Sequence, residues 1–390
     1  MIDFNFEIKT KLYFGKDKEL LTGEILASLN VKKVLIVIGQ SSVKKSGLLD
    51  RVITTIKEHD IDYRILEGVI PNPSLEKCHE GVALAKEYHP DFILAIGGGS
   101  VMDTAKSIAV GYYYDGDTFD FNLHKLEPKQ ALPVGAIVTI AASGSEMSTS
   151  CVIQNYETET KIGFNSELVR PVFAIENPEL TYSVSPTQTA YGVVDIMMHT
   201  LERYFQPSSN NEVCDYFALG LLKSVVEAGK AVHDNPKDYE ARSTLLLCSS
   251  LSHNGLTNIG KKPFMPVHQL EHVLSGFYPH VAHAAGLSVL FPAWAKYYIP
   301  YDVEKFSKLS EFLFGLHNVD KLQNAYDGIK ALEEYFKYLD MPLTYKDLDI
   351  ENPDLEKFAN KLTNDGQRTI YHHTKPMTYE VALEIYKKCL

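Results

Sequence analysis

The sequence lacks the patterns of a membrane-spanning, secreted or nucleic-acid-binding protein. No uninterrupted apolar run approaches the roughly 20 residues that a membrane helix needs. The first residues, MIDFNFEIKTKLYFG, include early acidic residues and no apolar core, so we expect no signal peptide. The 38 Lys and Arg are outnumbered by 50 Asp and Glu. The resulting formal charge of −12 argues against nucleic acid or an anionic membrane surface as the main partner.

Cysteine is scarce, and its spacing excludes two kinds of site. The chain has five cysteines, an odd number, and none forms a CxxC pair. They are Cys78, Cys151, Cys214, Cys248 and Cys389. This pattern predicts reduced thiols in a cytoplasmic protein and no thiolate metal site.

Two common catalytic fingerprints are also missing. No GxGxxG follows an apolar run, so the usual dinucleotide-binding fingerprint is not met. The segment SGSE contains no GxSxG, which leaves an esterase without support. What the chain does have is 390 residues, 45% of them hydrophobic and 23% charged, which is enough for one large or two medium globular domains.

The first half alternates short apolar runs with amphipathic segments. VKKVLIVIGQ, DFILAIGGGS and ALPVGAIVTI contain runs typical of strands buried on both faces, and helical periodicity occupies the stretches between them. Ser74 is a candidate N-cap for the helix that follows it. Alternation at this spacing predicts βαβ units and a parallel, Rossmann-like sheet covered by helices on both faces.

The character of the chain changes near Ser185–Pro186. Beyond that point nearly every segment has helical periodicity: 187–205, 211–233, 237–255, 266–276, 284–297, 303–315, 319–338, 351–362 and 378–389. We therefore predict an α/β dinucleotide-binding domain at 1–185 and an all-helical metal- and substrate-binding domain at 186–390. Ligand sites favour clefts between domains, so we expect one here.

Small residues follow three of the predicted strands. AIGGGSVMD at 95–103 leads from a buried strand through three glycines into a helix. Glycine lets backbone N–H groups approach a pyrophosphate, and a helix N-terminus also attracts anions. TIAASGSEMS at 139–148 and GQSS at 39–42 also follow strands. Because the carboxyl ends of parallel strands face one crevice, the three loops together predict a dinucleotide site.

Histidines and one aspartate recur at helical spacing in the second half. Asp195 and His199 are four residues apart, as are His268 and His272, so each pair shares one face of a helix. A carboxylate with several imidazoles suits Fe(II), Zn(II) or another late divalent metal rather than Ca or Mg. The same spacing is also an ordinary feature of solvated helices, so spacing alone leaves both interpretations open.

Together these segments resemble a known family. The chain is similar to the iron-containing (group III) alcohol dehydrogenases, and most to their bacterial NAD(P)H-dependent butanol dehydrogenase branch. The resemblance covers essentially the whole chain and rests on SVKKSG (42–47), NP (72–73), GGGSVMDTAKSIA (97–109), SGSEM (143–147), ENPELT (176–181), DIMMHTLERYF (195–205), HQLEHVLSGFYPHVAHAAGLSVLFPAW (268–294) and LEIYKKC (383–389).

The resemblance implies a set of site residues. It places the ligands of one divalent metal, Fe(II) or Zn(II), on Asp195, His199, His268 and His283, and a proton-handling catalytic histidine on His272. By spacing alone, His280 could replace His283. The implied cofactor-binding residues are Gly39, Gln40, Ser42, Asn72, Gly98, Gly99, Ser100, Asp103, Thr139, Ser143, Lys161 and Leu180.

The most consequential departure from the family pattern is Gln40. Many relatives have Asp at this position, which binds the ribose 2′-hydroxyl of NAD and repels a 2′-phosphate, whereas NADP users have Gly. Gln40 does not repel a phosphate, and Lys44 and Lys45 are close in sequence. We therefore expect NADP or NAD as the cofactor, with a slight preference for NADP.

These observations predict a metal-dependent oxidoreductase that exchanges a hydride between NAD(P)H and a small alcohol or aldehyde, such as butanol or butyraldehyde. A glycerol or diol dehydrogenase is an alternative within the same fold. A dehydroquinate-synthase-like lyase is another, although Phe264, Met265 and Leu270 make the ligand region apolar for its acidic substrate. A non-catalytic dinucleotide sensor would have no need of a metal set. The resemblance further implies a homodimer.

Overall fold

The computed structural model describes residues 2–206, 211–262, 264–370, 372 and 374–390. The chain forms two compact units. The α/β unit comprises Glu7–Val184 and Ser249–Asn254. The helical unit comprises Met1–Phe6, Ser185–Cys248 and Gly255–Leu390. A short N-terminal segment thus groups with the helical unit, and Ser249–Asn254 groups with the α/β unit. The predicted domain division at 185/186 stays a prediction.

The α/β unit is built on a six-stranded sheet in the order β1-β8-β5-β4-β2-β3. Its strands are β1 (Lys11–Phe14), β2 (Lys33–Gly39), β3 (Asp62–Val69), β4 (Phe92–Gly97), β5 (Val134–Val138) and β8 (Phe173–Glu176). Every pair of neighbours is parallel. The predicted parallel sheet is confirmed, and β5, β4 and β2 lie next to one another in it.

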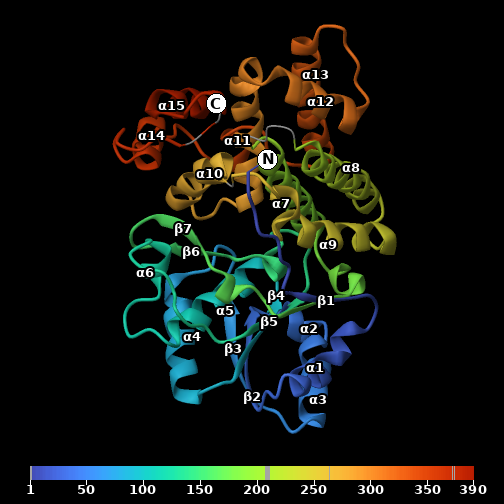
Figure 1. Ribbon diagram of the computed structural model, residues 1–390, viewed down its shortest axis with the longest axis vertical. Coiled ribbons are helices and arrows are strands. Elements are labelled where there is room, and N and C mark those ends of the chain that lie inside the picture. Colours follow the sequence, from blue (N-terminus) through green and yellow to red (C-terminus); the bar gives the residue numbers. More distant parts are fainter. Residues whose placement is uncertain (1, 207–210, 263, 371, 373) are drawn as a thin grey trace. The chain divides into compact units, whose positions relative to one another are not determined.

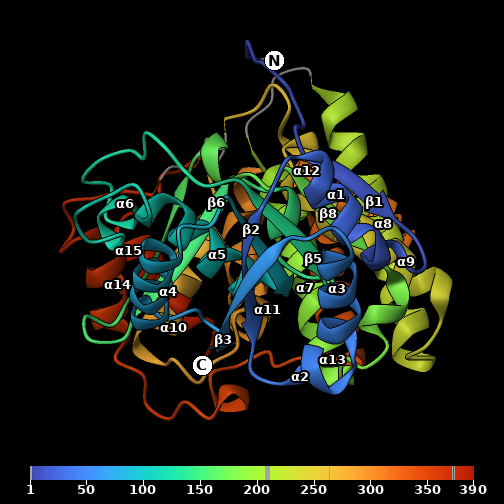
Figure 2. The same ribbon diagram turned by 90° about the horizontal axis from the view of Figure 1, so that it is seen from below.

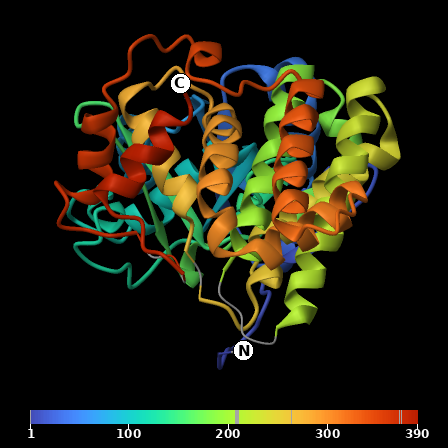
Figure 3. The same cartoon turned by 90° about the horizontal axis from the view of Figure 1, so that it is seen from above.

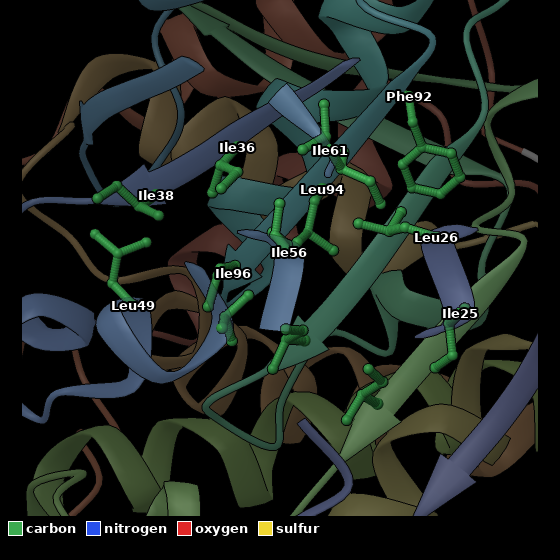
Figure 4. Close-up of a cluster of buried hydrophobic side chains, with 14 of the residues drawn as sticks. Ile25, Leu26, Ile36, Ile38, Leu49, Ile56, Ile61, Phe92, Leu94 and Ile96 are labelled. Carbon is green, nitrogen blue, oxygen red and sulfur yellow. The ribbon is translucent and has the colours of Figure 1, made fainter. Parts of the chain in front are cut away.

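Helices cover both faces of this sheet (Figure 2). They are α1 (Thr22–Ser28), α2 (Ser42–Lys45), α3 (Leu48–Glu58), α4 (Leu75–Tyr88) and α5 (Gly99–Gly111). The short helix α6 (Phe119–Asn122) instead packs on the two-stranded ribbon described below (Figure 1). Alternate strand residues point to opposite faces. Ile36 and Leu94 pack against α1 and α3 (Figure 4), whereas Leu35 and Ile93 pack with residues of α4 and α5.

The ends of the helices match their local sequence. Ser74 accepts a hydrogen bond from the Lys77 backbone N–H at 3.2 Å, so the predicted N-cap of α4 is confirmed. Gly98 precedes α5 directly after β4, as the strand–glycine–helix pattern predicts.

A two-stranded antiparallel ribbon, β6 (Ser150–Asn155) and β7 (Thr160–Asn165), was not predicted. Its turn is polar, and the Asn155 side chain accepts hydrogen bonds from the backbone of Glu157 and Thr158. The ribbon has too few apolar residues for periodicity to reveal it. It packs on α4, α5 and α6 and adds a small third core around Phe121, Ile153 and Phe164.

The helical unit contains nine α-helices in its described part, and each overlaps one predicted range. They are α7 (Pro186–Tyr204), α8 (Glu212–Asp234), α9 (Tyr239–His253), α10 (Pro266–Phe277), α11 (His283–Tyr298), α12 (Val303–Phe314), α13 (Lys321–Tyr338), α14 (Leu355–Thr363) and α15 (Tyr379–Lys387). The largest difference is at α14, which begins at Leu355 rather than 351. Pro353 precedes the helix, and Asp354 caps it by accepting from the Lys357 N–H at 3.0 Å.

Helix α7 lies at the centre of this unit, packed against α8 and α11. Helix α10 pairs with α11, α12 with α13 and α14 with α15, and the last two pairs appear orange and red in Figure 3. Phe205, Phe291, Trp294 and Phe306 form a buried aromatic cluster with ring centroids 4.2–6.4 Å apart. Dense apolar packing of this kind holds the backbone of α7 and α11 in fixed positions.

Candidate metal centre and cofactor loops

Helix α7 supplies the first two predicted ligands. The helix begins at Pro186, and the preceding Ser185 caps it by accepting from the Gln188 N–H at 3.2 Å. Asp195 and His199 lie on one face, with His199 Nδ1 3.5 Å from Asp195 Oδ1. Both side chains are buried although both are polar. Polar groups are buried in this way where they have partners or bind metals.

Helices α10 and α11 bring two more predicted ligands to the same carboxylate. The Nε2 atoms of His268 and His283 are each 4.0 Å from Asp195 Oδ1. The His268 ring centroid lies 4.6 Å from that of His199 and 5.2 Å from that of His283. The structure therefore brings all four predicted ligands together, although they span nearly 90 residues of sequence.

A metal site needs several ligand atoms close together, and the donor atoms of these residues are. One donor atom each from Asp195, His199 and His268 lie within 4.8 Å of one another. The Nε2 atom of His268 is buried and has no hydrogen-bond partner among the residues that the structure describes. A buried imidazole nitrogen aimed at a carboxylate and two other imidazoles fits a late divalent cation.

His272, the predicted proton-handling residue, lies beside this group rather than within it. Its ring centroid is 5.7 Å from that of His283 and 6.4 Å from that of His268. Its side chain is partly buried. Donor atoms of His272, Glu271 and His283 form a second group within 4.8 Å. His280, the alternative ligand, is exposed and belongs to neither group.

Two carboxylates that the sequence analysis did not single out contact the histidines. Glu202 contacts the Nδ1 atom of His268, and Glu271 contacts the Nδ1 atom of His283. Both glutamates are fully buried. Their spacing offered a signal: Glu202 lies seven residues after Asp195 and Glu271 three after His268, each on the ligand-bearing face of its helix.

The predicted cofactor residues belong to the α/β unit, and most follow its strands. Gly39 ends β2, and Gln40 and Ser42 follow it; Gly98–Ser100 follow β4, and Thr139 and Ser143 follow β5. These three strands are adjacent and parallel, so their following loops lie at one edge of the sheet. The loops after β4 and β5 touch: a Cβ at Gly98 would lie 2.5 Å from Ile140 Cγ2, and one at Gly99 would collide with Ser143.

The remaining cofactor candidates lie in other segments. Asn72 follows β3 in a left-handed conformation with φ of 52°, and its carbonyl accepts from the Tyr156 hydroxyl at 3.0 Å. Lys161 is buried in β7. Leu180 is in a short 3-10 helix, Pro178–Thr181, and packs against the core beneath α1 and α3.

Asp103 is engaged by the protein itself. Its Oδ1 accepts from Ser145 Oγ at 2.7 Å, and its Oδ2 accepts from the Val152 N–H at 3.0 Å. Nearby, the buried Lys106 ammonium donates to Ser145, Ser148 and Ser150 at 2.8–3.1 Å. Burial raises the pKa of Asp103 against the opposing effect of Lys106, and burial lowers the pKa of Lys106. In this structure Asp103 therefore holds the loop after β5.

Two buried glutamates, Glu146 in the same loop and Glu176 at the end of β8, share a contact with Ser250. Ser250 Oγ lies 2.9 Å from Glu146 Oε1 and also contacts the Glu176 carboxyl. Burial, with the nearby Glu146 charge, raises the pKa of Glu176 well above its usual range, and burial likewise raises that of Glu146. Ser249 Oγ accepts from the backbone N–H groups of Ala142 and Gly144, at 3.1 and 3.2 Å.

Two family models together match most of the chain. The model described as "Iron-containing alcohol dehydrogenase" matches residues 9–178. The model described as "Fe-containing alcohol dehydrogenase family, C-terminal" matches residues 189–390. The chain belongs to the iron-containing alcohol dehydrogenase family. The predicted family is thereby confirmed.

Several members of this family resemble the chain over its full length. NADH-dependent butanol dehydrogenase A of Clostridium acetobutylicum is 37% identical over 100% of both chains. The NADPH-dependent aldehyde reductase YqhD of Escherichia coli is 30% identical over 99% of both. The crystal structure of NADH-dependent butanol dehydrogenase A from Thermotoga maritima superposes with a TM-score of 0.95 at 32% identity, covering 100% of this chain and 99% of that one.

Among the described residues, no helix is both long and apolar enough to cross a bilayer.

Proposed function

We propose that this iron-containing alcohol dehydrogenase transfers a hydride between NAD(P)H and a primary alcohol or aldehyde, with butanol and butyraldehyde as the first substrates. The observation that carries the proposal is the convergence of three histidines on Asp195 in the helical unit. The names of relatives, butanol dehydrogenase and aldehyde reductase, support the substrate class.

The reaction balances without a further reactant. In the reducing direction, a hydride passes from the nicotinamide to the carbonyl carbon, a proton reaches the oxygen, and NAD(P)⁺ and an alcohol are released. A divalent metal, when bound, acts as a Lewis acid that stabilises negative charge on the substrate oxygen. We assign the holding of this metal to Asp195, His199, His268 and His283. The donor set supports Fe(II) or Zn(II).

His272 is the proposed proton carrier. Imidazole is the side chain that most often transfers protons near neutral pH. The partial exposure of His272 lets it exchange a proton with water, and its ring lies beside those of His268 and His283. We therefore assign to a His272 ring nitrogen the proton that reaches the substrate oxygen.

The cofactor is NADP or NAD, and we propose a slight preference for NADP. Gln40 is exposed after β2 and carries no charge that would repel a 2′-phosphate. Lys45 is exposed on α2 and forms no ion pair with any described residue. Lys44, by contrast, already contacts the Glu67 carboxylate, so it contributes less positive charge. Relatives include both NADH- and NADPH-dependent enzymes, so the preference within the family varies.

We further propose a cytoplasmic homodimer. All five cysteines are free and buried, as expected of thiols kept reduced in the cytoplasm. The dimer is carried over from the family resemblance. Sedimentation equilibrium of the purified protein measures its mass, and a monomer at all concentrations would contradict the dimer.

The experiment that tests the function measures NAD(P)H oxidation by the purified, metal-loaded protein. The panel contains butyraldehyde, shorter and longer aldehydes, glycerol and a propanediol. We expect the highest kcat/KM for butyraldehyde and comparable short aldehydes. Metal analysis by mass spectrometry of the same sample identifies the ion.

Three outcomes would contradict the proposal. No turnover of any aldehyde would remove the oxidoreductase assignment. Full activity after thorough metal removal would remove the role of the metal. A preference for glycerol or the diol by more than tenfold would replace the butanol assignment with the diol dehydrogenase alternative. His280→Ala, which changes an exposed histidine outside the donor groups, is the matched control and should keep wild-type activity and metal content.

A further inference from the structure

Two histidines of the candidate metal centre share one arrangement. In each, Nε2 faces the Asp195 carboxylate at 4.0 Å while Nδ1 contacts a buried glutamate. The glutamate that contacts His268 is Glu202, which is 1% exposed, and the one that contacts His283 is Glu271, which is 0% exposed. Because burying a carboxylate in an apolar interior is costly, each requires a compensating partner.

The contacts connect three helices in order. Glu202 on α7 contacts His268 on α10, and Glu271 on α10 contacts His283 on α11. Helices α7 and α10 thus each supply the carboxylate that contacts the histidine of the next helix. The relation cannot be read from one helix alone, because each contact joins residues 66 or 12 positions apart.

Glu202 has a second contact that fixes its own position. Helix α10 begins at Pro266, and Met265 before it provides no side-chain cap. Instead, Glu202 Oε1 accepts from the backbone N–H groups of Val267 and His268 in the first turn. A carboxylate at a helix N-terminus satisfies unpaired N–H groups and interacts favourably with the helix dipole. One side chain therefore anchors both the start of α10 and the ring of its ligand.

Glu271 is held in place by contacts with α10 and α11. Its Oε1 accepts from the Ser275 hydroxyl one turn later on α10. Helix α11 approaches it at Gly286, where an added Cβ would lie 2.9 Å from Glu271 Cγ. The absence of a side chain at Gly286 thus allows the carboxylate to reach His283.

We propose that Glu202 and Glu271 are positioning residues for the metal, an inference that rests on the proposed metal-dependent function. A neutral imidazole has one N–H, and a carboxylate that accepts it at Nδ1 leaves the lone pair at Nε2. Each glutamate therefore fixes the tautomer and ring orientation that direct Nε2 of His268 and His283 toward the site. Outer carboxylates of this kind also raise the basicity of the ligand nitrogen.

The test measures metal binding rather than turnover. Zn(II) affinity is determined by competition with a chromophoric chelator, and the visible absorption of the Co(II)-loaded protein reports the ligand field. We expect Glu271→Ala to lose about 10- to 100-fold in Zn(II) affinity and to alter the Co(II) spectrum. Glu271→Gln should lose less, because its carbonyl oxygen can still accept the Nδ1 hydrogen. Glu202→Gln, which retains an acceptor for the α10 backbone, should behave like Glu271→Gln.

A matched control separates this role from the general cost of losing a buried carboxylate. Glu19 is 1% exposed, contacts Arg51 and Asn177 in the α/β unit, and has no histidine partner among the described residues. Glu19→Gln should keep wild-type Zn(II) affinity and the wild-type Co(II) spectrum. Circular dichroism and urea unfolding of the metal-free proteins establish that each variant is folded.

The outcomes distinguish the inference from the function on which it rests. If the wild type binds neither Zn(II) nor Co(II), the proposed metal-dependent function fails. If the wild type binds both ions and the folded Glu271 variants match it in affinity and spectrum, the inference alone is overturned. Loss of affinity without any spectral change would also overturn it, because ring orientation would then be unaffected.

Discussion

At the residue scale, the candidate metal centre gathers several carboxylates and imidazoles that are largely buried. Asp195 and His199 are at most 6% exposed, and Glu202 and Glu271 are buried behind the histidines. Three carboxylates this close repel one another in a low-dielectric interior, so they require positive charge nearby. A divalent cation held by Asp195 and the histidines would supply that charge, so the composition of the site supports the proposed metal.

Single ligand substitutions should remove metal and activity together. Asp195→Ala and His268→Ala each delete one donor atom from the converging group, so metal content and kcat should both fall at least 100-fold, on the order of 3 kcal/mol in the barrier. Elemental analysis and aldehyde reduction are measured on the same preparation. A variant that keeps both would exclude that residue from the ligand set.

Gln40 should control the choice between NADPH and NADH. Gln40→Asp places a negative charge where a 2′-phosphate would bind, so the kcat/KM ratio of NADPH to NADH should fall by roughly tenfold, or about 1.4 kcal/mol. Ser28→Asp, an acidic change at the end of α1, is a control for net charge. An unchanged ratio in Gln40→Asp would mean that the adenosine ribose contacts another residue.

Glu176 should make stability depend on pH. Its folded-state pKa is raised by burial, so the folded protein binds more protons than the unfolded chain above the ordinary pKa of a glutamate, and stability falls as pH rises from there. One such group changes stability by about 1.4 kcal/mol per pH unit until the folded pKa is reached. Glu176→Gln should flatten the pH dependence of urea unfolding, whereas exposed Glu157→Gln should not. An equal slope in wild type and Glu176→Gln would contradict this.

At the scale of elements, function is divided between strand-end loops and helix faces. Three adjacent parallel strands present their loops at one sheet edge in the α/β unit. In the helical unit, α7 and α10 each bury polar residues within otherwise apolar packing, and the apolar α11 contributes His283 at its first residue. The glycines after β4 allow the neighbouring loop after β5 to come close, since a Cβ at Gly99 would collide with Ser143.

Gly99→Ala should weaken cofactor binding. The new methyl group must displace Ser143, which moves the loop after β5 relative to the start of α5. We expect the Kd for NADPH, measured by fluorescence titration, to rise about tenfold with metal content unchanged. Gly220→Ala in α8 meets nothing within 4 Å and should bind NADPH normally, with stability equal or higher. Wild-type affinity in Gly99→Ala would show that the two loops tolerate separation.

At the scale of the whole molecule, the metal and cofactor candidates belong to different units. The metal candidates are in the helical unit and the cofactor candidates in the α/β unit. Each unit buries its own apolar side chains, so we expect a ligand bound to one unit to stabilise mainly that unit. Metal binding to the folded state alone stabilises that state by an amount that grows with the ratio of free metal to Kd.

Metal removal should therefore destabilise one unit and leave cofactor binding intact. A chelator should lower the calorimetric transition of the helical unit; metal at about 100 times its Kd contributes about 2.7 kcal/mol. Aldehyde reduction should stop, while the NADPH Kd should change less than threefold. Returning Zn(II) or Fe(II) should restore the transition, and a chelator that leaves it unmoved would contradict a metal bound in this unit.

The sequence by itself determined the layers of this protein and its candidate residues. Period-2 and period-3.6 patterns are local, so the nine C-terminal helices, the main buried strands and the cap at Ser74 could be predicted from neighbouring residues. The ribbon β6–β7 could not, because its pattern is weak and its pairing depends on α4 and α5.

Only the tertiary structure decided which residues meet. Spacing left open whether Asp195 and His199 are a metal pair or an ordinary helical pair, and it gave His268 and His272 the same status. The packing of α7, α10 and α11 brings His268 and His283 to Asp195 and sets His272 to one side. It also brings Glu202 and Glu271 against the far side of two imidazoles. Contacts between residues distant in sequence depend on how helices pack, and no local pattern encodes them.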